Sequence, residues 1–162
     1  MKKFWLSALL FLPLTALGTA QADEVRCSGG IGARSIDGDI VVPRGATCTL
    51  SGTVVDGNVK VERGGTLVMN SARVGGNVQS EGLRSVSVSG GSVGGSIQLK
   101  EGGRVTLQNV RVNGDIQLEK NSGPVLVRSN NVGGNLQCQG NSGISGSGNR
   151  VDGNKEDQCR SF

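Results

Sequence analysis

A short motif returns along the chain at a nearly constant interval of 19 residues. Each copy has five residues, as in VDGNV and VNGDI. It opens with an aliphatic residue, has a central glycine with a polar residue or glycine on either side, and closes with a second aliphatic residue. The last copy lacks the closing aliphatic residue. The central glycine stands at Gly38, Gly57, Gly76, Gly95, Gly114, Gly134 and Gly153, so that every interval is the same except the one from Gly114 to Gly134, which is one residue longer. A period of this length, kept over seven copies, is the sequence signature of a solenoid.

Alignment of the copies on this period shows which positions are apolar. The motif-opening column reads Ile36, Val55, Val74, Val93, Val112, Val132 and Val151, and the motif-closing column reads Ile40, Val59, Val78, Ile97, Ile116 and Leu136. Three more columns begin at Val42, Cys48 and Leu50. Their period of two within each copy is typical of short strands with one buried face, whereas no stripe with a helical period exists.

These patterns predict an all-β fold, a single-stranded parallel β-helix or solenoid with about 19 residues per coil and six to seven coils. Each strand would pair with its equivalent in the next coil, about 4.8 Å away along the axis. The rule for crossover connections between parallel strands favours a right-handed coil. The single longer interval predicts one enlarged turn, between Glu119 and Gly123.

Four segments follow from this pattern. Residues 1–22 combine two lysines, an apolar run and an Ala-Gln-Ala sequence, which is typical of a cleaved secretory signal peptide. We expect residues 23–35 to form an N-terminal cap with Cys27, residues 36–151 the solenoid, and residues 152–162 a polar C-terminal cap with Cys159. No later apolar run is long enough to span a membrane. The sequence therefore predicts a secreted or periplasmic protein.

The four cysteines form two pairs with the same spacing. The interval from Cys27 to Cys48 equals the interval from Cys138 to Cys159, and both exceed the motif period by two positions. Cysteines of an exported chain are more often disulfide-bonded than metal-bound. An interval slightly longer than one coil brings the members of each pair onto adjacent coils, so we predict disulfides Cys27–Cys48 and Cys138–Cys159 at the two ends.

Composition excludes several functions. The chain has no His and no Tyr, and Phe162 is the only aromatic residue after residue 22, which removes histidine-based catalysis, histidine metal ligands and aromatic platforms for sugars. Without Lys2 and Lys3, 15 basic residues stand against 13 acidic ones, a net charge of +2. A nucleic-acid partner needs a basic stripe and stacking platforms, so we expect none.

Exposed columns carry the candidate sites. The most regular is a glutamine column, with Gln79, Gln98, Gln117 and Gln137, which is either a ladder of side-chain hydrogen bonds or a binding face. Asp37, Asp39 and Asp56 would meet where the first coils stack, and such oxygen-rich clusters are weak candidates for a calcium site, with turn formation as the alternative explanation. No catalytic residue and no other cofactor is assigned.

Two further surfaces allow alternative interpretations. Thr47, Thr49 and Thr66 begin a threonine and serine face that resembles ice-binding solenoids, although the strand preference of these residues explains it as well. Arg44 and Arg63 share a column near the aspartates, an arrangement reminiscent of β-helical polysaccharide lyases. The predicted turns are too short to build the cleft that such an enzyme needs.

The motifs VGGNV, VNGDI and VGGSI resemble the repeats of bactofilins, polymer-forming bacterial β-helix proteins. The resemblance implies a right-handed parallel β-helix and end-to-end polymerisation without a nucleotide. The export signal and the paired cysteines differ from that family, so we expect a monomer, with end-to-end self-association as the alternative.

The sequence thus favours an exported, non-enzymatic β-solenoid that serves as a rigid structural or adhesin-like interaction module at the cell envelope, with an envelope glycan or protein as its partner. The alternative is a carbohydrate-active or calcium-dependent glycan-binding β-helix protein.

Overall fold

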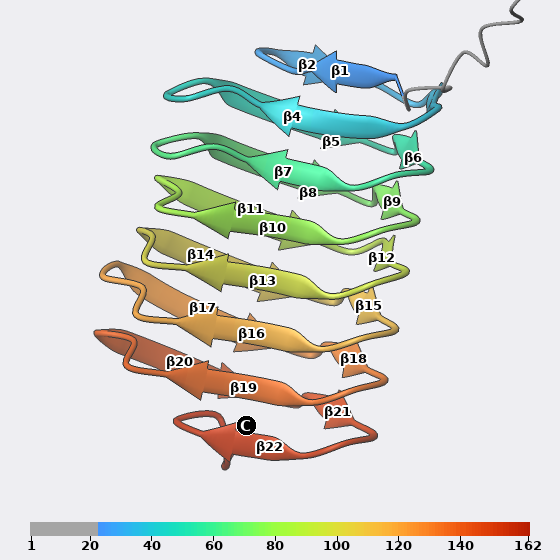
Figure 1. Cartoon of the computed structure of the whole chain (residues 1–162). Helices are drawn as coiled ribbons and strands as arrows, with labels where there is room; N and C mark the ends of the chain where they lie inside the picture. Colours follow the sequence, from blue (N-terminus) through green and yellow to red (C-terminus); the bar gives the residue numbers. More distant parts are fainter. Residues whose placement is uncertain (1–22) are drawn as a thin grey trace, which may run out of the picture.

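Three parallel sheets surround one axis in the computed structural model, which describes residues 23–162 (Figure 1). The predicted signal peptide, residues 1–22, lies outside the described residues. The sheets have eight, seven and seven strands, and the described residues contain no helix. The predicted fold class, an all-β parallel solenoid in which each coil takes up one sequence period, is confirmed.

We name the sheets by their place in Figure 1. The front sheet contains β1 (Glu24–Arg26), β4 (Asp39–Val42), β7 (Val59–Val61), β10 (Val78–Glu81), β13 (Ile97–Lys100), β16 (Ile116–Glu119), β19 (Leu136–Gln139) and β22 (Lys155–Asp157). The rear sheet contains β2 (Gly30–Ile31), β5 (Thr47–Ser51), β8 (Thr66–Asn70), β11 (Ser85–Ser89), β14 (Arg104–Gln108), β17 (Pro124–Arg128) and β20 (Gly143–Ser147). The side sheet contains β3 (Ser35–Ile36), β6 (Val54–Val55), β9 (Arg73–Val74), β12 (Ser92–Val93), β15 (Arg111–Val112), β18 (Asn131–Val132) and β21 (Arg150–Val151).

The pairing register follows the sequence period. Val59 pairs with Val78, and Val78 pairs with Ile97, so neighbours along a column are one period apart in the sequence. Between β16 and β19 the partners, such as Ile116 and Leu136, are separated by one residue more. The backbone amide of Ser122 donates a hydrogen bond to the carbonyl of Gly102, and these two residues are also separated by the longer interval. The extra residue therefore lies before Ser122, in the predicted enlarged turn.

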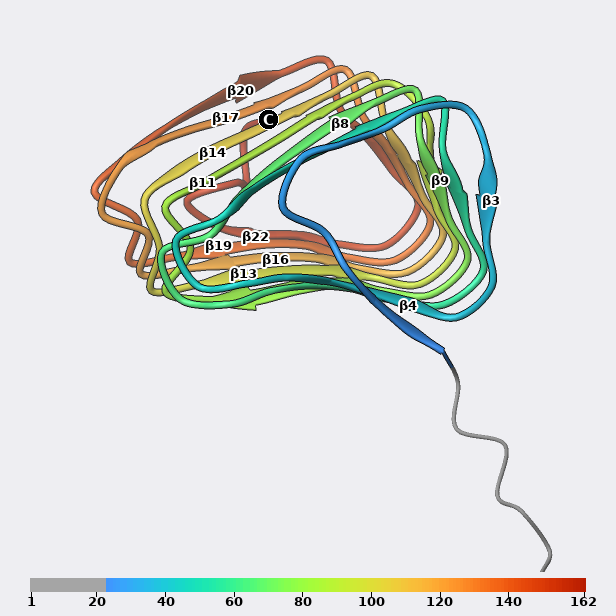
Figure 2. The same cartoon turned by 90° about the horizontal axis from the view of Figure 1, so that it is seen from above.

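The path of the chain has one hand throughout. Seen from the N-terminal end, the chain runs clockwise around the axis while it recedes from the viewer (Figure 2). This direction is that of a right-handed coil, as expected for crossovers between parallel strands.

The core consists of aliphatic columns stacked along the axis. Val59, Val78, Ile97, Ile116 and Leu136 are fully buried, and the other predicted inward columns lie beside them in one cluster. Ser80 is the polar exception in its column, and its hydroxyl donates a hydrogen bond of 2.7 Å to the Val61 carbonyl. The core is therefore continuous along the rod, and the outward positions are left to determine the surface.

Both ends of the rod are closed by parts of the sheets themselves. β1 pairs with β4, and β22 pairs with β19, so both predicted caps contribute a strand to the front sheet. At the C-terminal end a side chain at Gly146 would collide with the ring of Phe162, and the Lys155 ammonium contacts the Phe162 carbonyl. The ring thus fills the place where the aliphatic column ends.

Both predicted disulfides are present, Cys27–Cys48 and Cys138–Cys159. Each joins an end of the rod to the adjacent coil, and all four cysteines are buried. No helix in the described residues is long and apolar enough to cross a membrane.

We predict that the double variant Cys138→Ala/Cys159→Ala lowers the free energy of unfolding by about 3 kcal/mol, because the open chain gains conformational entropy when it unfolds. Urea unfolding followed by circular dichroism measures the difference. The wild-type protein unfolded with and without a reductant is the control, since reduction opens the bonds and leaves the side chains in place. Equal stability of oxidised and reduced protein would contradict the stabilising role of the disulfides.

Candidate functional site

Two parallel rows of outward side chains run along the front sheet. They arise because successive residues of a strand point to opposite faces, so residues two apart share the outer face. The amide row, which contains the predicted glutamine column, consists of Lys60, Gln79, Gln98, Gln117, Gln137 and Glu156. The charged row, one step further along each strand, consists of Glu62, Glu81, Lys100, Glu119 and Gln139.

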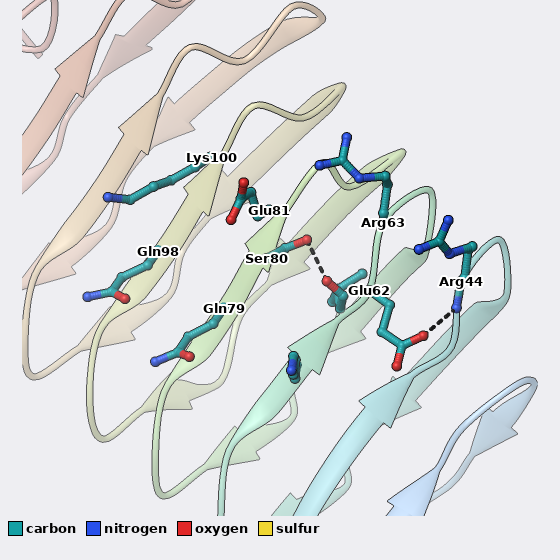
Figure 3. Close-up of a pocket in the computed structure, with 10 residues that line it drawn as sticks. Arg44, Glu62, Arg63, Gln79, Ser80, Glu81, Gln98 and Lys100 are labelled. Atoms are coloured by element: carbon teal, nitrogen blue, oxygen red, sulfur yellow. Dashed lines mark hydrogen bonds between the residues drawn. The ribbon is translucent and has the colours of Figure 1, made fainter.

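A groove of about 500 Å³ lies between these rows. Its floor is at Val61 and Ser80, whose side chains are buried, so the main chain forms the bottom. Arg44 and Arg63, from the turns that connect the front and rear sheets, close the side beyond the charged row (Figure 3). The groove is parallel to the axis of the solenoid and open to solvent.

Gly82 makes room for the side chain of Arg63. A Cβ at Gly82 would lie 3.2 Å from the Cγ, Cζ and Nη1 atoms of Arg63. Gly82 has a left-handed backbone with φ of 77°, but Glu101 and Lys120 adopt φ of 51° and 52° at the equivalent positions. The turn therefore does not require glycine. Because Gly82 has no side chain, the side chain of Arg63 can lie across the next coil.

The charges around the groove are only partly paired. Lys100 forms an ion pair of 3.0 Å with Glu119, and Glu62 lies 3.9 Å from Arg26. A carboxylate oxygen of Glu62 also accepts a hydrogen bond of 3.0 Å from the backbone amide of Arg44. Within residues 23–162 no ion pair involves the side chains of Arg44, Lys60 or Arg63.

The glutamine column is in register, and it does not form the ladder of hydrogen bonds that was one of its two interpretations. Gln79, Gln98, Gln117 and Gln137 face one another on successive strands. Among the described residues no hydrogen bond joins one of these side-chain amides to the next. The only hydrogen bond between side chains of the row is that of 3.1 Å from Gln137 Nε2 to Glu156 Oε2. The amides therefore remain as donors and acceptors for another molecule.

The three aspartates considered as calcium ligands are not gathered into one cluster. Asp39 Oδ1 accepts hydrogen bonds of 2.7 and 3.1 Å from the backbone amide and the side chain of Asn58. Asp37 and Asp56 are exposed at the neighbouring corner position. In the described chain no group of three carboxylate, cysteine or histidine side chains is placed to hold a metal ion.

Asp39 instead begins a corner ladder that runs the length of the rod. Its members are Asp39, Asn58, Asn77, Ser96, Asp115, Asn135 and Asn154, and each side-chain oxygen accepts the backbone amide of the next member at 2.7 to 3.0 Å. For Asp39 the sequence offered turn formation as the alternative to a calcium site, without the hydrogen bonds between coils. This role explains why the position directly after the central glycine of the motif carries a short side chain with an acceptor oxygen.

Two buried asparagine pairs at other corners were not predicted. The amide and side chain of Asn121 bond to Asn141 Oδ1, and those of Asn130 bond to Asn149 Oδ1 in the same way. The signal in the sequence is the recurrence of asparagine about one period later in both pairs.

The rear and side faces carry other outward residues. The threonine and serine face lies on the rear sheet as predicted, and the exposed Arg104 interrupts it next to Ser85. The side sheet has a hollow of about 430 Å³ between Arg73 and Arg111, with Ser92 between them.

No protein-family model matches the chain, and no curated protein or solved structure matches it either. The structure supports the coarse part of the likeness to bactofilins, a parallel β-solenoid made of repeats.

We predict that Asn77→Ala lowers the free energy of unfolding by about 1 to 3 kcal/mol, because the Ser96 amide loses its acceptor and the side-chain hydrogen bond from Asn77 Nδ2 to Asn58 disappears. Asn113→Ala is the matched control, since Asn113 lies at an exposed corner position, two residues before the ladder member Asp115, and its side chain has no hydrogen bond within the described chain. Urea unfolding of both variants measures the effect. Equal losses in the two variants would show that the ladder adds nothing specific.

We predict that calcium does not stabilise the protein, because the carboxylate of Asp39 is engaged in the corner ladder. Thermal unfolding with and without millimolar calcium should give the same Tm. A site occupied at a hundred times its Kd would add about 2.7 kcal/mol and raise the Tm by several degrees. Such a rise, lost in Asp39→Asn, would restore the calcium hypothesis.

Proposed function

We propose that the protein is a rigid, non-enzymatic interaction module that is exported and acts at the cell envelope or outside it, where it presents the front sheet to an envelope glycan or protein. The observation that carries this proposal is the groove on the front sheet, a straight polar surface on a rod with a continuous core. A surface fixed in this way offers binding groups in positions that do not need to be ordered on contact.

The proposed compartment is supported by the two buried disulfides at the ends of the rod. Disulfides persist in oxidising surroundings such as the periplasm and the extracellular space, and they are rare in the reducing cytosol. The same bonds hold the first and last coils, and Phe162 covers part of the C-terminal end. These features support a monomeric rod in preference to an end-to-end polymer.

The proposed absence of enzymatic activity rests on the chemistry of the side chains. The chain has no histidine, so a general base would have to come from a carboxylate, a lysine or an arginine. Glu62, the carboxylate of the groove nearest to Arg44, is engaged with the Arg44 amide and with Arg26. The groove is open to solvent, whereas catalytic sites usually exclude water.

We predict that the purified, oxidised protein sediments with isolated bacterial cell-envelope material and does not degrade its glycans. Co-sedimentation, followed by analysis of the soluble fraction for released sugars, measures both properties. Protease treatment of the envelope material beforehand distinguishes a glycan partner from a protein partner. Failure of the wild-type protein to sediment would contradict the interaction role, and released oligosaccharides would favour a carbohydrate-active protein instead.

A further inference from the structure

The front-sheet groove is shaped for an extended chain. It reaches from the turn with Arg44 to Lys100, across four successive coils. Three strand spacings of about 4.8 Å give it a length of about 14 Å along the axis. Its two walls are straight because each consists of residues in register, and the turns beside it are too short to close over it.

The groove carries an excess of positive charge. Four basic residues, Arg44, Lys60, Arg63 and Lys100, stand against the two carboxylates of Glu62 and Glu81, which leaves a charge of +2. Lys100 is paired with Glu119, so the cations available to a ligand are those on the turns and at the end of the amide row. Such cations attract a ligand with negative charges, and a guanidinium binds a carboxylate through two parallel hydrogen bonds.

The amide row also provides uncharged hydrogen-bonding groups beyond Lys60. The amides of Gln79 and Gln98 stand one strand spacing apart, and neither bonds another side chain within residues 23–162 (Figure 3). An amide both donates and accepts, which suits hydroxyl groups. A ligand that fits this groove has hydroxyl groups beside Gln79 and Gln98 and separated negative charges beside Arg63 and beside Lys60, which ends the same row as the glutamines.

We propose that this groove binds a linear acidic polysaccharide, with the carboxylates of its uronic acid units against Arg63 and Lys60 and its hydroxyl groups against Gln79 and Gln98. This inference rests on the interaction role proposed above and names the class of its ligand. Glu62 and Glu81 stand between the cations and repel a polymer with densely spaced charges, such as a polyphosphate. Nucleic acid is disfavoured because Phe162, the only aromatic residue among those described, packs against Gly146 at the end of the rod.

The test is a binding measurement with the oxidised protein and two polymers, polygalacturonate as the acidic probe and dextran as the neutral one. The groove variant is Lys60→Gln/Arg63→Gln, in which residue 60 takes the side chain that its column already carries in four later coils. The matched control is Arg73→Gln/Arg111→Gln, which removes the same charge from the side sheet.

We expect wild-type protein to bind polygalacturonate and not dextran. The groove variant should bind polygalacturonate about tenfold more weakly, as expected for the loss of two exposed charge contacts, and the control variant should bind as the wild type does. Raising the salt concentration should weaken binding by the wild type more than by the groove variant. Thermal unfolding of both variants verifies that the fold is retained.

Equal weakening in the two variants would overturn the assignment to this groove, because it would show attraction by net charge alone. Equal binding of dextran or of polyphosphate would overturn the assignment of the ligand class. Wild-type protein that sediments with envelope material but does not bind polygalacturonate would leave the proposed function standing and this inference refuted.

Discussion

Pairing between each coil and the next is the constraint on which the whole molecule depends. A strand of two to five residues has no stable partner within its own coil, so its backbone groups are satisfied by the strands above and below it. This pairing fixes the register at one period, as for Val59 and Val78. Residues one period apart therefore become neighbours, and any chemical property kept in a column becomes a continuous line on the surface or in the core.

At the corners between sheets, some backbone amides depend on side-chain acceptors. At a corner the chain leaves one sheet for the next, and a buried amide without an acceptor would cost about 1 to 3 kcal/mol. At one corner the ladder provides acceptors for amides that are mostly part-buried, as Asn58 Oδ1 does for Asn77. Asparagine, aspartate and serine all place an oxygen close to the main chain, which accounts for their exchange at this position. Asp39, one of the three aspartates considered as calcium ligands, is thus part of this ladder.

The sequence was sufficient for the features that repeat and insufficient for those that occur once or a few times. The inward columns, the enlarged turn near Ser122 and both disulfides follow from the period. Because the coils stack, residues one period apart in the sequence become neighbours in space. The buried pair Asn121–Asn141 was not predicted, because this corner is occupied by Leu83 and Gly102 in other coils. The column therefore shows no common residue type in the sequence. The position of the Arg63 side chain over Gly82 depends on space in the neighbouring coil, which no single repeat encodes.

The regular surface also restricts the kind of ligand that the groove can hold. Each exposed charge or amide contributes little on its own, commonly less than about 1 kcal/mol for a charge pair at the surface. Appreciable affinity therefore requires several contacts made at once by a ligand long enough to span several coils. The continuous core keeps the contact groups in place before binding, so little ordering of the protein opposes their combined effect. A small molecule that touches one coil makes few of these contacts, whereas an extended polymer laid along the axis can contact the polar groups of several coils at once.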